Sequence, residues 1–130
     1  MQSQTACAPN RFNQLAQLAV DLVSNTLFVA DFLNHRVMVF FAAHTKPDTS
    51  NADLVLGQPD FVTCTFACTA TNMNEPAGVS FDSASGTLFV GDFSNNRFSR
   101  KRKRKDNTTT NRMTNKLSHN NQQPTKNNME

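Results

Sequence analysis

The sequence predicts an all-β protein made of antiparallel meanders of short strands, followed by a disordered C-terminal tail. Three observations lead to this fold class. A segment of 26 residues occurs twice, each copy alternates apolar, strand-like runs with polar turns, and residues 1–98 contain no amphipathic helical pattern. A chain of 130 residues with 38% apolar residues is expected to form one small domain at most.

The repeat is the strongest signal in the chain. Residues 12–37 align with residues 73–98 at an offset of 61, and 12 of the 26 aligned pairs are identical. A period of this kind indicates one supersecondary unit that is used more than once, each copy being unable to bury its apolar face alone.

Each copy is expected to fold as consecutive antiparallel strands. In the first copy, LAVD and TLFVAD flank the polar turn at residues 22–25, a pattern typical of a β-hairpin. A second turn at residues 32–35 leads into RVMVFF, whose β-branched and aromatic residues favour a third strand. A fourth strand is expected in DLVLGQ, at residues 53–58.

The second copy repeats the hairpin as VSFD, a turn at residues 83–86, and TLFVGD. We therefore divide the chain into five parts. These are an N-terminal extension at 1–11, the first unit at 12–58, a polar loop at 59–72, a second, incomplete unit at 73–98 and a basic, low-complexity tail at 99–130.

The segment LAVDLVSNTLFVADFLNHRVMVF resembles the NHL repeat, and GVSFDSASGTLFVGDFSNNRF is similar to it as well. The piece ADLVLGQPDF resembles the linker that precedes the next repeat in a subset of such proteins. The resemblance covers about residues 13–98. It implies a partial NHL-type β-propeller in which each meander is one blade, and it is specific for fold and not for function.

A shared D-x-x-N-x-R motif spans the second turn of each copy. Asp and Asn satisfy backbone amides in tight turns, and the Arg can donate a charge-assisted hydrogen bond to the Asp carboxylate. Because the motif occurs in both copies, we favour a structural role over a ligand-facing one. The residues concerned are Asp31, Asn34, Arg36, Asp92, Asn95 and Arg97.

The second copy departs from the first after Phe98, where SRKRKRKD replaces an apolar strand. Burying several unpaired charges costs several kcal/mol each, so we do not expect this run to form an inner strand of a blade, and the second blade is expected to be incomplete. Three explanations are considered: a truncated or frame-shifted sequence, a fragment of a longer chain, or a protomer that completes a ring by assembly, and we favour the first two. Open blade faces would leave apolar residues partly exposed and favour self-association. These are Phe28, Phe40, Phe41, Phe81, Phe89 and Val90.

Charge is divided unevenly along the chain. Residues 1–98 carry 4 basic and 8 acidic side chains, whereas residues 99–130 carry 9 basic and 2 acidic ones. The tail has too few apolar residues to fold, and its basic run could form a nuclear-import or nucleic-acid patch. The alternatives are a solvated charge run without a partner, or out-of-frame translation. The residues of the run are Arg100, Lys101, Arg102, Lys103, Arg104 and Lys105.

Three cysteines are too few for a disulfide framework. Cys64 and Cys68 could form a local disulfide or half of a metal site, but plain loop cysteines are the favoured interpretation. The histidines, at positions 35, 44 and 119, are scattered, so no metal site or cofactor is expected. No secretory signal or membrane-spanning run is found, which leaves the compartment open.

Function is expected to be non-catalytic, because no phosphate loop, nucleophile elbow or zinc-protease motif occurs. We expect a binding scaffold with a protein partner. One alternative is RNA or other nucleic-acid binding through the basic tail. Another is a remnant of a gluconolactonase-like propeller enzyme, whose family binds a divalent ion through Glu, Asn and Asp from several blades.

Overall fold

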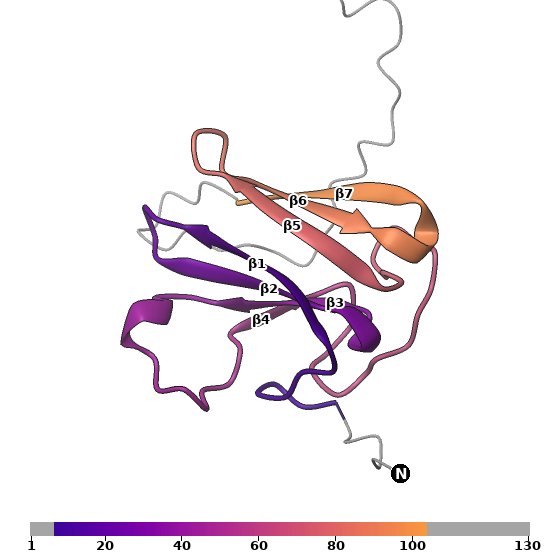
Figure 1. Ribbon diagram of the computed structural model, residues 1–130, viewed down its shortest axis with the longest axis horizontal. Helices are drawn as coiled ribbons and strands as arrows, with labels where there is room; N and C mark the ends of the chain where they lie inside the picture. The colour runs from indigo at the N-terminus through magenta and orange to yellow at the C-terminus, as the bar shows by residue number, and fades with distance from the viewer. Residues whose placement is uncertain (1–6, 104–130) are drawn as a thin grey trace, which may run out of the picture.

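A computed structural model describes residues 7–103, which form two antiparallel β-sheets joined by a long loop. Figure 1 shows the sheets as two layers, with β1 of the first next to β5 of the second. The expected all-β class is confirmed. The regular helical elements within residues 7–103 are three single turns of 3-10 helix, and no helix there is long and apolar enough to cross a membrane.

The first sheet is a four-stranded meander in chain order. Its strands are β1 (Leu15–Asp21), β2 (Thr26–Asp31), β3 (Arg36–Phe40) and β4 (Leu54–Leu56). All four strands predicted from the first copy are therefore present. Asn25 closes the first hairpin with φ of 54°, a left-handed conformation that Asn tolerates better than most residues.

The second sheet repeats the first three strands of this arrangement. It consists of β5 (Pro76–Asp82), β6 (Thr87–Asp92) and β7 (Arg97–Arg102), again in chain order. The expectation that the basic run cannot form an inner strand is wrong, because β7 runs on to Arg102 and buries Lys101. Side chains alternate between the two faces of a strand, so only some of the charges in this run point inward.

Both copies turn their second corner with a 3-10 helix, η1 (Phe32–Asn34) and η3 (Phe93–Asn95). Each is followed by one residue in the left-handed region, His35 with φ of 55° and Asn96 with φ of 49°. A third turn, η2 (Ala43–Thr45), lies in the loop between β3 and β4.

The main core lies between the two sheets. Phe28, Val37 and Val39 of the first sheet pack with Leu88 and Val90 of the second, and all five are buried. The expected partial exposure of Phe28, Phe40 and Val90 is wrong, because the sheets cover one another and the Phe40 side chain packs into a second cluster on the far face of the first sheet. Phe89 is 38% exposed, as expected for a face that lacks a neighbour.

Candidate functional site

The corner of the first copy is organised around the Asp31 carboxylate. Asp31 accepts hydrogen bonds from the Asn13 amide at 2.7 Å, Asn34 Nδ2 at 2.9 Å and Arg36 Nε at 2.8 Å. The side chains of Asp31 and Arg36 are fully buried. The hydrogen bond predicted between Arg36 and Asp31 is thus present, and both of its side chains are shielded from solvent.

Arg36 also ties two distant segments to this corner. Its Nη1 donates to the carbonyl of Phe61 at 2.7 Å, and its Nη2 donates to the carbonyls of Ala8 at 3.0 Å and Arg11 at 2.8 Å. The guanidinium therefore holds the segment before β1 against the loop after β4. A fork of five N–H donors is suited to this task, whereas a lysine ammonium is not.

The second corner uses the same bonds. Asp92 accepts from the Asn74 amide at 2.7 Å, Asn95 Nδ2 at 2.9 Å and Arg97 Nε at 2.8 Å. The Arg97 side chain is 25% exposed, whereas Asp92 is fully buried.

The remaining bonds of Arg97 also match those of Arg36 at the offset of 61. Arg97 Nη2 donates to the carbonyls of Thr69 and Asn72, both at 2.6 Å, where Arg36 binds Ala8 and Arg11. The motif therefore holds the corner of each copy together, and both of its carboxylates are fully buried.

The cysteines pair differently from the expectation. Cys7 and Cys64 form a disulfide, with their Cα atoms 6.4 Å apart, while Cys68 is free and exposed. The favoured interpretation of Cys64 and Cys68 as plain loop cysteines is therefore wrong for Cys64, which pairs with Cys7. The physical reason is Arg36, which holds the two segments carrying these cysteines side by side.

A signal for this pairing was present in the sequence. The repeat extends further back than residue 12, because Ala6-Cys7 and Ala67-Cys68 are separated by the same offset of 61. Cys7 and Cys68 are therefore counterparts in the two copies. Cys64 lies in the loop between the units, which Arg36 joins through the Phe61 carbonyl to the segment that carries Cys7.

The GQ pair of the GQPDF motif also has a structural use. Gly57 has φ of 90°, and a Cβ atom there would lie 2.8 Å from Cγ of Met73. Gln58 is buried and its Nε2 donates to the carbonyls of His35 and Thr65 at 2.9 and 2.8 Å. This motif joins the end of β4 to the corner of the first copy and to the long loop.

Of the basic run, the structure describes residues 100–103, whose side chains lie in different surroundings. Lys101 is buried between the sheets, and its Nζ has no hydrogen-bond partner within residues 7–103. Burial, with a smaller effect from Arg97, lowers the pKa of Lys101 to about 7. Arg100 and Arg102 lie on the outer face of β7, while Arg104 and Lys105 are outside the described residues.

Lys103, at the end of this run, joins the two sheets. Its Nζ donates to Asp21 Oδ2 and, at 2.6 Å, to Ser24 Oγ in the first hairpin. Burial raises the pKa of Asp21, but the hydrogen bonds from Lys103, Ser24 and the Val23 amide outweigh this effect, and the pKa is lowered overall. This charge is therefore engaged inside the protein.

A hollow of about 460 Å³ lies beside the two corners and combines polar and aromatic groups. We call it the corner hollow. Its lining residues are Asn13, Leu33, His35, Phe66, Asn74, Glu75 and Ser94.

The polar groups of the corner hollow connect the two copies. The Glu75 amide donates to His35 Nδ1 at 3.1 Å, and Ser94 Oγ donates to the Glu75 carboxylate. The Phe66 ring meets the His35 ring edge-on, with centroids 5.6 Å apart. Partial burial lowers the pKa of His35, against the opposing effect of nearby carboxylates, Glu75 first among them. A neutral imidazole is therefore favoured.

Sequence reasoning did not single out these residues. The two copies differ at three of the positions, with His35, Glu75 and Ser94 aligned with Asn96, Gln14 and Leu33. Positions that vary between otherwise similar copies are where one copy can carry a function that the other lacks, and this signal could have found them.

Within residues 7–103, no three His, Cys, Asp or Glu side chains lie close enough together to hold a metal ion. No known family model matches the sequence, and no curated protein is detectably similar to it.

Proposed function

We propose that the chain is part of an NHL-type β-propeller and acts as a non-catalytic module that binds a protein partner. Two meander sheets of the same design, packed in chain order with β1 beside β5, support the propeller assignment. The motif residues resembling the NHL repeat are the ones that fasten each corner.

The corner hollow is the observation that carries the binding proposal. Inter-strand loops are the usual places for recognition on a rigid β-scaffold. Phe66 is 68% exposed at its rim, and the Glu75 carboxylate lies within it. An exposed aromatic ring beside a carboxylate and amides suits a peptide segment that offers an apolar side chain and a basic or hydrogen-bonding one.

A hydrolytic role through the corner carboxylates is less well supported. Asp31 and Asp92 are each 0% exposed and each accept three hydrogen bonds. A catalytic acid or base must come within hydrogen-bond reach of its substrate, which these side chains do not.

Selection of peptides from a displayed random library against the full chain tests the proposal. Selected peptides should lose roughly tenfold or more in affinity on Phe66→Ser and on Glu75→Gln, because truncating a contact at the centre of a binding site costs more than about 1 kcal/mol. The matched control is Val62→Ser, which lies in the same loop, is also 68% exposed and does not line the hollow.

Equal affinity for the wild type, Phe66→Ser and Glu75→Gln would place binding elsewhere and reject the corner hollow. Turnover of a lactone or ester that is abolished by Asp31→Ala or Asp92→Ala, in protein shown to be folded, would reject the non-catalytic assignment.

A further inference from the structure

Residues that form the buried interface between the two sheets have counterparts, at the repeat offset of 61, on two outer surfaces of the protein. On the second sheet, the interface is formed by Met73, Val79, Leu88 and Val90, all buried against the first sheet. At the offset of 61, their counterparts in the first copy are Phe12, Leu18, Leu27 and Val29. These four residues lie together on the far side of the first sheet, on which no other sheet of residues 7–103 packs; Leu18 is exposed there, whereas Val29 is buried.

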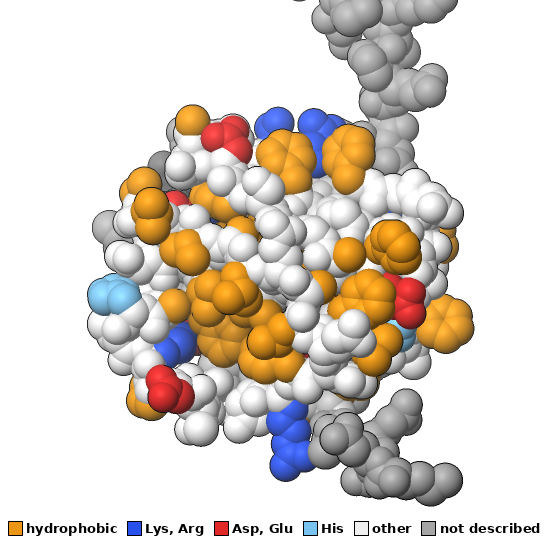
Figure 2. Space-filling model, in the orientation of Figure 1, with side chains coloured by type: hydrophobic (Ala, Val, Ile, Leu, Met, Phe, Trp, Pro, Cys, Tyr) orange, Lys and Arg blue, Asp and Glu red, His pale blue; other side chains and the backbone are white. Residues whose placement is uncertain are grey.

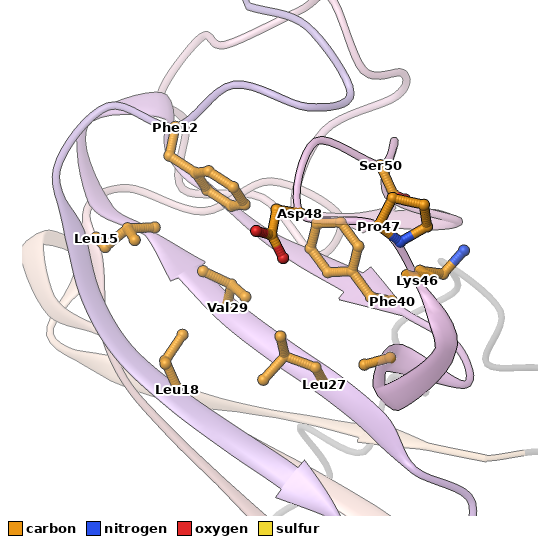
Figure 3. A pocket seen from close by; sticks show the side chains of 11 residues that line it. Phe12, Leu15, Leu18, Leu27, Val29, Phe40, Lys46, Pro47, Asp48 and Ser50 are labelled. Carbon is orange, nitrogen blue, oxygen red and sulfur yellow. The ribbon is translucent and has the colours of Figure 1, made fainter.

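They line a hollow of about 320 Å³, together with Leu15, Phe40 and the loop between β3 and β4 (Figure 3). Leu15 and Leu18 are 54% and 56% exposed. Figure 2 shows the resulting gathering of apolar side chains over the first sheet. We call this surface the hollow face. Its members are Phe12, Leu15, Leu18, Leu27, Val29 and Phe40.

The second open surface is the outer side of the second sheet. On the first sheet, Phe28 and Val37 fill the interface and are each 0% exposed. Their counterparts at the offset of 61 are Phe89 and Phe98, which are 38% and 70% exposed. Arg100 pairs with Phe89 across the two strands and so lies on the same side.

We call this second surface the phenyl face and define it by Phe89, Phe98 and Arg100. In Figure 2, apolar and basic side chains lie side by side over the second sheet. Besides the interface between its own two sheets, the chain thus presents a second surface of each kind, and no further sheet of residues 7–103 packs on either one.

We propose that this chain associates head to tail with a second copy of itself, the phenyl face of one copy packing on the hollow face of the next. The packing would repeat the one between the two sheets, with Phe89 and Phe98 in the roles of Phe28 and Val37. The two surfaces are different, so the contact is heterologous, and it adds copies in one direction until a ring closes.

Charge complementarity supports the same pairing. Arg100 stands where the first copy has Val39, and it adds a positive charge to the phenyl face. Figure 3 shows the Asp48 side chain directed over the hollow from the loop between β3 and β4. Lys46 of that loop is engaged by Asp53, with Nζ 3.1 Å from the carboxylate, so the hollow offers a carboxylate to Arg100.

Sedimentation velocity of the full chain over micromolar to millimolar concentrations tests this contact. The wild type should form dimers and larger species with rising concentration. Phe98→Asp and Leu18→Asp should each be monomeric, because each places a charge on one of the two apolar faces. Both side chains are largely exposed in the single chain, so circular dichroism should show an unchanged fold.

A mixture of the two variants gives the sharpest result. Phe98→Asp keeps its hollow face and Leu18→Asp keeps its phenyl face, so together they should form a one-to-one dimer that grows no further. The matched control is Leu22→Asp, which is 81% exposed in the first hairpin turn and outside both faces, and it should assemble like the wild type.

Reversal of the charge pair adds an independent test. Asp48→Arg should weaken association by roughly tenfold, and adding Arg100→Asp should restore it. A wild type that stays monomeric throughout would overturn the proposal. Self-association of Phe98→Asp alone would also overturn it, since that would mean one face pairs with itself, and so would a variant mixture that remains monomeric.

Discussion

At the scale of single residues, Arg36 and Arg97 occupy the same motif position but should contribute differently to the free energy of unfolding. Both donate Nε to an Asp carboxylate at 2.8 Å and bind backbone carbonyls of the segment that precedes their copy. Arg36 is fully buried and also binds Phe61, whereas Arg97 is 25% exposed. Water can replace lost bonds at Arg97 but not at Arg36.

Lysine substitution separates these two situations. Arg36→Lys should lower the free energy of unfolding by about 2 to 4 kcal/mol, because one ammonium cannot satisfy a buried carboxylate and three backbone carbonyls at once. Arg97→Lys should lower it by about 1 kcal/mol. Urea unfolding of both variants measures the difference. Equal losses of unfolding free energy at the two sites would show that burial does not determine how much the motif arginine stabilises its corner.

Lys101 is a second residue whose environment predicts a measurable effect. Its ordinary pKa is 10.5, and the folded protein lowers it to about 7. Between these values the unfolded chain binds a proton that the folded chain does not, so the free energy of unfolding rises with pH from about 7 to about 10.5.

Lys101→Met should be more stable than the wild type at pH 7 by a few kcal/mol and should lose most of this pH dependence, since it removes the unpaired amine from the interior. Urea unfolding at several pH values measures both effects. Arg102→Met, on the exposed side of the same strand, serves as the control and should keep the wild-type slope. Parallel curves for the wild type and Lys101→Met would contradict a buried amine.

At the scale of elements, the Cys7–Cys64 disulfide closes the first copy on itself. It joins the segment before β1 to the loop after β4, across a sequence separation of 57. In the chain-entropy model, a loop of this length corresponds to about 4 kcal/mol of stabilisation.

Peptide mapping under non-reducing conditions should therefore recover a peptide pair linking Cys7 to Cys64, with one free thiol at Cys68. Cys7→Ser should be destabilised to about the extent produced by reduction, while Cys68→Ser should match the wild type. A linked pair of Cys64 and Cys68 would contradict the structure and return the pairing to sequence neighbours.

Local chemistry explains which elements could be predicted from the sequence. The hairpins and corners follow from apolar alternation and turn residues within a few positions, as in TLFVAD followed by the Asp31 corner. The extent of β7 was mispredicted because Arg100 to Lys103 were treated as one run of charge. Alternation places Lys101 inside but leaves Arg100 and Arg102 on the outer face, and Lys103 finds a partner in Asp21.

The candidate site depends on contacts that spacing alone does not determine. His35 meets the Glu75 amide across 40 residues, and Cys7 meets Cys64 where Arg36 bonds to both of their segments. Such pairs follow from how two copies pack, and the repeat alone could indicate which positions are counterparts.

At the scale of the whole molecule, the two sheets share one core and several polar links. The Val79 amide donates to Gln17 Oε1 at 3.0 Å, Lys103 bonds to Asp21, and the Phe28 and Phe81 rings stack at 5.0 Å between centroids. Within residues 7–103, the largest buried apolar cluster lies between the two sheets. A second, smaller one lies on the outer side of the first sheet. The two sheets should therefore unfold together.

Alanine at two equivalent phenylalanines tests this cooperativity. Phe28→Ala should lower the free energy of unfolding by about 3 to 5 kcal/mol, because it empties a fully buried site between the sheets. Phe89→Ala, at the counterpart position, should lower it by less than about 1 kcal/mol in dilute, monomeric protein, since this ring packs against no second sheet. Hydrogen exchange should show protection falling in both sheets of Phe28→Ala. Loss of protection confined to the first sheet would mean that the second sheet is stable by itself. The interface between the sheets, on which the proposed head-to-tail contact is patterned, would then contribute little to stability.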